Sequence, residues 1–202
     1  MKTVLVTSST ADVLGTSEAK DWLRVTTTDE DGLIDGLVTA ARQTIEEITN
    51  RKIMKGTYYA YYDDWPSGND YDSVYLPYAP LVSVPTTAIE YTDSEGDTTT
   101  FSSSKWATDT ASEPGRVVLD YDYDWPTETL HNNNPIRVKF TCGYSSKADS
   151  SIPEWVKTAT KILVATWYEN RESVIVLSGG QSVAEVPMSV KAILQPHRVW
   201  SI

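Results

Sequence analysis

The sequence predicts an α+β fold in which a small helical bundle carries an inserted antiparallel β-rich module. Two stretches with apolar residues at helical spacing, 17–51 and 151–171, enclose a middle that is rich in aromatic, β-branched and turn-forming residues. The chain has 202 residues and is 40% hydrophobic, enough to bury a core. We therefore expect residues 1–52 to supply the N-terminal helices, 53–150 the insertion, and 151–202 the C-terminal helices, a mobile loop and the tail.

The N-terminal helical stretch divides into two helices. Ser17 is suited to cap a two-turn helix that ends near Arg24, because a serine hydroxyl can accept from the free amides of the first turn. Thr28 and Asp31 resemble a capping box that begins a second helix, which runs to about Asn50. The apolar residues of this second helix recur at intervals of three and four: Leu33, Ile34, Leu37, Val38, Ala41, Ile45 and Ile48.

The C-terminal stretch predicts one long helix and one short helix. Ser151 is a candidate N-cap for the long helix, since a proline and then Glu154 follow it in the first turn. The polar segment 168–172 closes this helix. The short helix covers Ser189–Leu194, and Pro196 stops it because proline cannot continue the hydrogen-bonding pattern.

The middle of the chain predicts short strands joined by turns. Gly96 lies at the centre of a hairpin turn, 93–97, where it supplies the positive φ that such turns need. Strand propensity is highest in residues 57–62, 73–76, 86–92, 98–101, 116–121 and 136–144. In the last of these runs one face is apolar throughout: Ile136, Val138, Phe140 and Cys142.

Composition excludes several classes of function. The formal net charge is -11, so the surface repels phosphates and a DNA-gripping role is disfavoured. Cys142 is the only cysteine, which rules out an intramolecular disulfide, and its apolar setting predicts a small core residue. The apolar run at the N-terminus is too short for a signal peptide, and no stretch is long enough for a membrane helix, so we expect a soluble chain.

The sequence contains no recognisable catalytic constellation. His131 and His197 are the only histidines and lack metal-ligand spacing, and the common hydrolase, P-loop, dinucleotide and zinc motifs are not found. We expect neither enzymatic activity nor a cofactor. Asp120, Asp122 and Asp124 would share one face of a strand and could gather a calcium ion, although a solvated acidic edge that discourages strand pairing is the favoured reading.

The aromatic content leaves a sugar-binding alternative open. The chain has seven tryptophans and twelve tyrosines, and aromatic rings can stack on sugars, but most of them fall on predicted core faces or turns. The long loop 173–187 is also unusual, because it combines an apolar beginning with glycines at its centre. Burial against a partner and packing onto the chain's own core both explain the residues concerned: Val174, Ile175, Val176, Leu177, Gly179 and Gly180.

Motifs along most of residues 17–200 resemble, in the same order, those of the head-tail connector (adaptor) proteins of tailed bacteriophages. The resemblance is to the long form, in which a β insertion lies between the helices. Each motif alone is common, and their shared order carries the resemblance; residues 1–16 have no counterpart. The matching segments are 18–25, 29–31, 40–42, 46–51, 76–84, 91–96, 141–144, 153–172 and 186–198.

The resemblance implies a structural protein of the virion neck that is assembled in the host cytoplasm. It implies a homo-oligomeric ring, usually dodecameric, which binds beneath the portal protein, extends the DNA channel and offers a platform to the next neck or tail-completion protein. DNA would pass through without specific binding, and no membrane is involved. Two alternatives remain: another phage tail-completion or baseplate ring subunit, and a carbohydrate- or calcium-binding β module.

The C-terminal tail is the expected portal contact. Trp200 could insert into a partner pocket, as interface tryptophans often do, or fold back over its own bundle. Deletion of everything after Pro196 is expected to leave the fold intact and to abolish portal attachment. The residues assigned to this contact are Pro196, His197, Arg198, Val199, Trp200 and Ile202.

Overall fold

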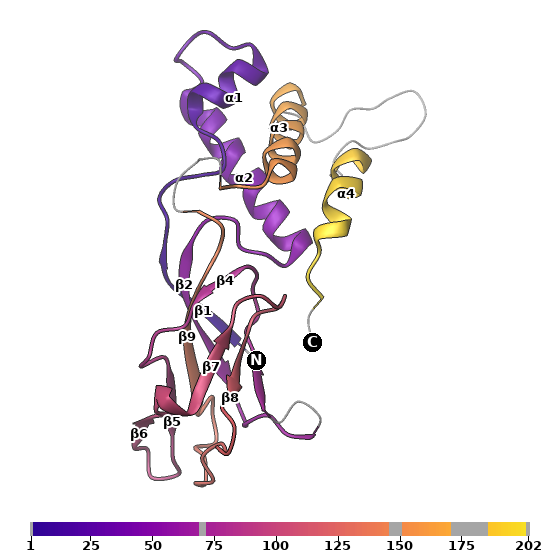
Figure 1. The fold of residues 1–202 in the computed structure, drawn as a ribbon. Helices are drawn as coiled ribbons and strands as arrows, with labels where there is room; N and C mark the ends of the chain where they lie inside the picture. Colours follow the sequence, from indigo (N-terminus) through magenta and orange to yellow (C-terminus); the bar gives the residue numbers. More distant parts are fainter. Residues whose placement is uncertain (1, 69–71, 146–150, 171–185, 201–202) are drawn as a thin grey trace, which may run out of the picture. The chain divides into compact units, whose positions relative to one another are not determined.

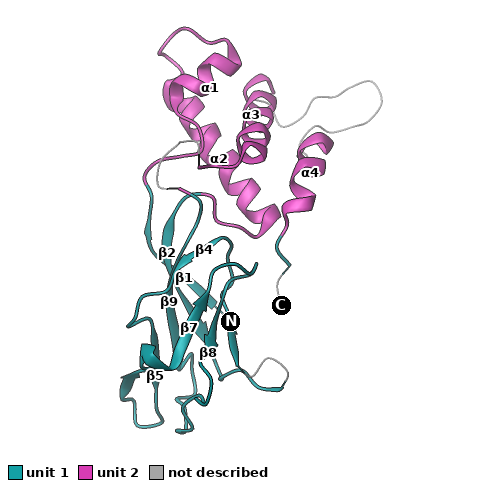
Figure 2. Ribbon diagram, viewed as in Figure 1, with its two compact units in different colours: residues 1–9, 54–144, 199–202 teal, residues 10–53, 145–198 magenta. Residues whose placement is uncertain are grey.

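The computed structural model describes residues 2–68, 72–145, 151–170 and 186–200. The chain forms two compact units, shown in separate colours in Figure 2. A β unit contains residues 1–9, 54–144 and 199–202, and a helical unit contains residues 10–53 and 145–198. Helices and antiparallel sheets together confirm the predicted α+β class.

The helical unit is built on a long central helix (Figure 1). Its helices are α1 (Thr16–Leu23), α2 (Asp31–Thr49), α3 (Glu154–Glu169) and α4 (Met188–Leu194), and a 3-10 turn (Gln195–His197) follows α4. Helix α2 packs against α1, α3 and α4. The side chains that these helices bury include Ile34, Val38, Ala41, Ile45, Val156, Ala159, Leu163, Val190 and Leu194.

The helices begin at residues other than the predicted caps. Gly15, Glu30 and Pro153 occupy the N-cap positions, and none of them makes a side-chain cap hydrogen bond. Ser17 therefore lies inside the first turn of α1, and Ser151 lies before the cap of α3, so both cap predictions were wrong. The predicted Thr28 capping box fails in the same way. In α1 the intrahelical hydrogen bonds begin at Gly15, whose carbonyl accepts from the Ala19 amide at 3.0 Å, so the helix starts before Ser17.

A buried carboxylate secures the chain where it leaves α2. Glu46 accepts hydrogen bonds from the Arg42 side chain (3.3 Å), the Lys52 side chain (3.3 Å) and the Ile53 amide (3.0 Å). Asn50 is the C-cap of α2, and its φ of 53° is the left-handed conformation typical of helix C-termini. This network satisfies Glu46, which would be costly to bury alone.

The β unit contains two antiparallel sheets. The larger has the order β1-β2-β9-β5-β6, with β4 also paired to β9, and the smaller has the order β3-β8-β7. In chain order the strands are β1 (Lys2–Ser8), β2 (Gly56–Tyr62), β3 (Ser73–Tyr75), β4 (Leu81–Ser83), β5 (Ile89–Thr92), β6 (Thr98–Thr100), β7 (Trp106–Asp109), β8 (Arg116–Leu119) and β9 (Ile136–Cys142).

One hydrophobic core draws residues from both sheets. Strand β9 lies near the middle of the larger sheet, and its alternate residues Ile136, Val138, Phe140 and Cys142 are all buried, as predicted. Many aromatic side chains also belong to this core, including Tyr58, Tyr91, Phe101, Trp106, Trp125 and Phe140. These rings serve the packing of the β unit, which is the role that the core-face pattern predicted for them.

The two ends of the chain are grouped differently from the expectation. Val199 and Trp200 were expected with the C-terminal helices, whereas they belong to the β unit. Residues 1–9 were expected with the N-terminal helices, whereas β1 pairs with β2 and belongs to the β unit. The brief apolar run Val4–Val6 carries no helical or alternating pattern, so only the pairing reveals it as a strand. Strand β7 was also not predicted.

Candidate functional site: the C-terminal segment and the pocket beside Trp200

The C-terminal segment is anchored in the helical unit as far as His197. The His197 ring stacks on Trp155 of α3, with ring centroids 4.3 Å apart and planes 9° from parallel. The main-chain carbonyl of His197 accepts a hydrogen bond from Arg51 Nε at 2.6 Å, and the Arg51 side chain is itself buried. Deleting the chain after Pro196 would remove the His197 ring from Trp155 and the carbonyl to which Arg51 Nε donates, so we expect this truncation to lower stability. Its effect on portal attachment stays a prediction.

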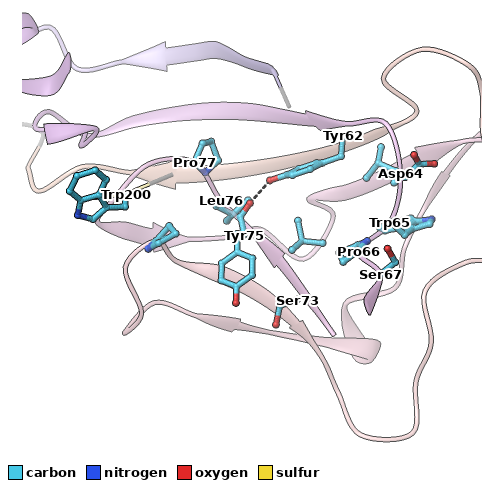
Figure 3. Close-up of a pocket in the computed structure, with 13 residues that line it drawn as sticks. Tyr62, Asp64, Trp65, Pro66, Ser67, Ser73, Tyr75, Leu76, Pro77 and Trp200 are labelled. Atoms are coloured by element: carbon cyan, nitrogen blue, oxygen red, sulfur yellow. Dashed lines mark hydrogen bonds between the residues drawn. The ribbon is translucent and has the colours of Figure 1, made fainter. Parts of the chain in front are cut away.

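The next residues divide into one buried and one exposed side chain. Val199 is buried, whereas Trp200 is 71% exposed. Trp200 lies at one end of a pocket in the β unit with a volume of about 320 Å³ (Figure 3). Of the assigned tail residues described by the structure, Trp200 is therefore the large apolar side chain that a partner can reach.

The pocket beside Trp200 is lined mainly by rings and prolines. Tyr62 of β2 and Tyr75 of β3 come from different sheets, and the Tyr62 hydroxyl donates to the Tyr75 carbonyl at 2.5 Å. Burial raises the pKa of Tyr62 above its usual range, so this phenol stays a hydrogen-bond donor. Trp65 forms another wall and stacks on Trp125 at 4.8 Å with planes 10° apart. Such a pocket suits an apolar or aromatic group.

The remaining predicted loop residues cannot be placed. Residues 174–177, Gly179, Gly180 and Ile202 lie outside the described part of the chain. His197 is placed by its stacking on Trp155, and Pro196 lies in the 3-10 turn that follows α4.

The acidic run after β8 does not have the geometry expected of it. Strand β8 ends at Leu119, and Asp120–Asp124 forms a turn in which Asp122 has a φ of 66°. The carboxylates therefore do not alternate along a strand, and the prediction of a shared face was wrong. Within residues 2–68, 72–145, 151–170 and 186–200, no group of three or more His, Cys, Asp or Glu side chains could hold a metal ion.

Sequence reasoning did not identify the pocket. Its lining residues are far apart in the chain, from Tyr62 and Trp65 through Pro114 to Ile136 and Trp200, and no motif links them. The cluster of aromatic and proline residues between 62 and 77 was the available signal, and it was interpreted as a turn and a short strand. Among the described helices, none is long and apolar enough to span a bilayer.

The comparison with protein families decides the identity of the chain. The family model described as "HCP: Head completion protein" matches residues 12–200. The chain belongs to the head completion protein family. This membership confirms the resemblance to the head-tail connector proteins of tailed phages.

Solved structures share the fold of this head completion protein. A chain of the "Neck of empty GTA particle computed with C6 symmetry", where GTA is a gene transfer agent, has a TM-score of 0.75 and 23% identity. Chains of the "Virion of native gene transfer agent (GTA) particle" and of the "Neck of native GTA particle computed with C12 symmetry" each have a TM-score of 0.73 and 22% identity. All three matches cover 100% of this chain and 97% of the other. No curated protein sequence matches the chain.

Proposed function

We propose that this head completion protein is a structural subunit of the virion neck. Copies of the chain form a homo-oligomeric ring that binds beneath the portal protein, continues the DNA channel and presents a platform to the next neck or tail-completion protein. The family match over residues 12–200 carries this proposal. Full-length similarity of fold to chains from necks computed with C6 and C12 symmetry supports the ring.

The portal contact is assigned to Trp200 and the pocket beside it. Interface tryptophans contribute strongly to binding when they bury a large ring in a partner. Trp200 offers such a ring, because it is 71% exposed and directly follows the buried Val199. The segment before it, up to His197, is held within the helical unit by the stacking on Trp155 and the hydrogen bond from Arg51.

Replacing Trp200 tests this assignment better than truncation does. Trp200→Ala is expected to weaken binding to the purified portal of the same phage about tenfold or more, since hot-spot truncation typically costs about 2 kcal/mol. Portal binding is measured by co-sedimentation and the assemblies by negative-stain imaging. Thermal unfolding should change little, because Trp200 is mostly exposed.

Tyr121→Ala is the matched control. Tyr121 is an aromatic residue of the same unit and is 91% exposed, so its loss should leave portal binding unchanged. Wild-type affinity in Trp200→Ala would remove the interface assignment and leave the neck role standing. A wild-type chain that forms rings alone and never joins the portal would instead favour another tail-completion or baseplate ring subunit.

A further inference from the structure

Strand β1 has a free edge that exposes apolar residues. It is the terminal strand of the larger sheet, and among the described residues it pairs with β2 only. Its residues Val4, Leu5 and Val6 are 41%, 53% and 42% exposed, on both faces of the strand. An edge strand with unpaired main-chain groups and exposed apolar side chains is a template for pairing with another chain.

The opposite edge of the same sheet is also open in the described part of the chain. Strand β6 pairs with β5 and ends the sheet on that side, and Figure 1 labels both terminal strands. All three of its residues, Thr98–Thr100, are exposed. Threonine is β-branched and favours extended backbone, so β6 can accept a further strand. The five-strand path of the sheet thus ends, among the described residues, in two strands of different sequence, and the short β4 is a side branch that pairs with β9.

Strand direction and face are compatible between the two edges. Each neighbouring pair from β1 through β2, β9 and β5 to β6 is antiparallel, so β1 and β6 run in the same direction. Residues that are register partners on neighbouring strands form one row across the sheet, and their side chains lie on its outward face: Lys2, Tyr61, Arg137, Glu90 and Thr100. A rotated second copy can therefore place its β6 alongside β1 in parallel, with outward-facing residues next to each other.

Charge favours this arrangement. Lys2 lies at the beginning of β1, whereas the exposed residues Glu95 and Asp97 lie just before β6. In a parallel pair the beginnings of both strands meet, so the lysine of one copy approaches the acidic turn of the other. On a chain with a net charge of -11, a positive charge at this edge helps to select another copy of the same acidic protein.

We propose that β1 of one copy pairs in parallel with β6 of the next copy, so that the larger sheets of adjacent subunits become continuous. The pairing segment is Lys2–Leu5, because the β1–β2 register shifts between Leu5 and Thr7. Two different edges make a heterologous contact, and where the rotation between copies closes into a ring, every β1 edge and every β6 edge is paired. The inference rests on the homo-oligomeric ring proposed above, and the family match, which begins at residue 12, does not assign it.

Paired cysteines test the contact. Val4→Cys lies on the outward face, so it should form a disulfide with Thr98→Cys or Thr100→Cys of the adjacent copy. In portal-bound assemblies, a double variant in one chain should give a ladder of disulfide-linked multimers on a non-reducing gel. Mixing the two single variants should give dimers only. The native Cys142 is fully buried and does not interfere.

The matched control places the second cysteine on the other face of β6. Thr99 pairs with the core-facing Tyr91, so Val4→Cys with Thr99→Cys should form no ladder. Rings without a ladder from either Thr98→Cys or Thr100→Cys would overturn the edge contact and leave the neck role intact. Dimers from Val4→Cys alone would overturn it too, since they indicate β1 pairing with β1. Absence of wild-type rings would instead contradict the proposed function.

A charge substitution gives a second test that does not depend on disulfide geometry. Leu5→Lys is expected to raise the concentration needed for ring formation about tenfold. Val82→Lys, on β4 of the same sheet and 39% exposed, should form rings like the wild type. Equal assembly of the two variants would argue against the β1 edge.

Discussion

Gly143 has a backbone φ of +110°, a conformation that residues other than glycine rarely adopt. A Cβ placed there would lie 2.5 Å from the Met54 carbonyl oxygen, so the main chain also lacks space for it. Gly143 follows β9, and its amide donates to Pro80 O at 3.0 Å. The glycine thus permits the turn that carries the chain out of the central strand.

Gly143→Ala is expected to lower the free energy of unfolding by about 2–3 kcal/mol, because it combines an unfavourable φ with a clash against backbone. Gly96→Ala is the matched control. Gly96 also has a positive φ, +95°, but its Cβ would meet open space, so we expect a loss of only about 1 kcal/mol. Urea denaturation of both variants measures the difference, and equal losses would contradict the role given to the Met54 contact.

At the scale of elements, one carboxylate organises the β7–β8 hairpin. Asp109 accepts from the Ser112 hydroxyl at 2.6 Å, the Ser112 amide at 3.1 Å, the Ala111 amide at 3.0 Å and Arg116 Nε at 3.0 Å. These hydrogen bonds, those from Ser112 foremost, lower the pKa of Asp109 from 3.8 to about 2. The charged form is therefore the one that the folded hairpin prefers.

This preference predicts an acid dependence of stability. The folded pKa lies below the unfolded one, so the stabilisation is complete above 3.8 and is lost as pH falls toward about 2. Asp109→Asn should flatten the pH dependence of the melting temperature in that window. Asp97→Asn, in the exposed β5–β6 turn, removes one charge elsewhere and serves as control. An unchanged slope in Asp109→Asn would show that the hairpin carboxylate does not contribute.

At the scale of the whole molecule, the negative net charge disfavours binding to DNA. The chain has 28 acidic and 17 basic residues, and protein binding to DNA requires cationic groups that neutralise phosphates. In the ring proposed above, an acidic wall would repel the duplex, as a channel through which DNA slides requires.

We therefore expect no retention of duplex DNA in gel-shift experiments at ~0.15 M salt, nor at ~0.05 M, where phosphate contacts are far stronger. Salt-dependent retention would contradict this expectation. The double variant Arg137→Glu and Lys139→Glu would then locate the contact, because both residues lie with Tyr59 on the outward face of the larger sheet.

Several features of the fold followed from local patterns. The helices α2 and α3 and the buried face of β9 were predictable. Apolar residues recur every 3.6 residues in a helix, or every two in a strand, wherever one face of the element packs against the core. Helix starts were predicted less well, because α1, α2 and α3 begin without a side-chain cap hydrogen bond and the serine and threonine pattern therefore did not mark them.

By itself the sequence determined the α+β class, the acidic character, the core role of Cys142 and, through motifs in a shared order, the family. Only the tertiary structure separated His197, stacked on Trp155, from the exposed Trp200, and brought strands from both sheets together around a pocket. It alone also showed that β1 and β6 end one sheet. The physical reason is that periodicity records which face an element buries, whereas strand order, stacking and free edges depend on contacts between residues far apart in the chain.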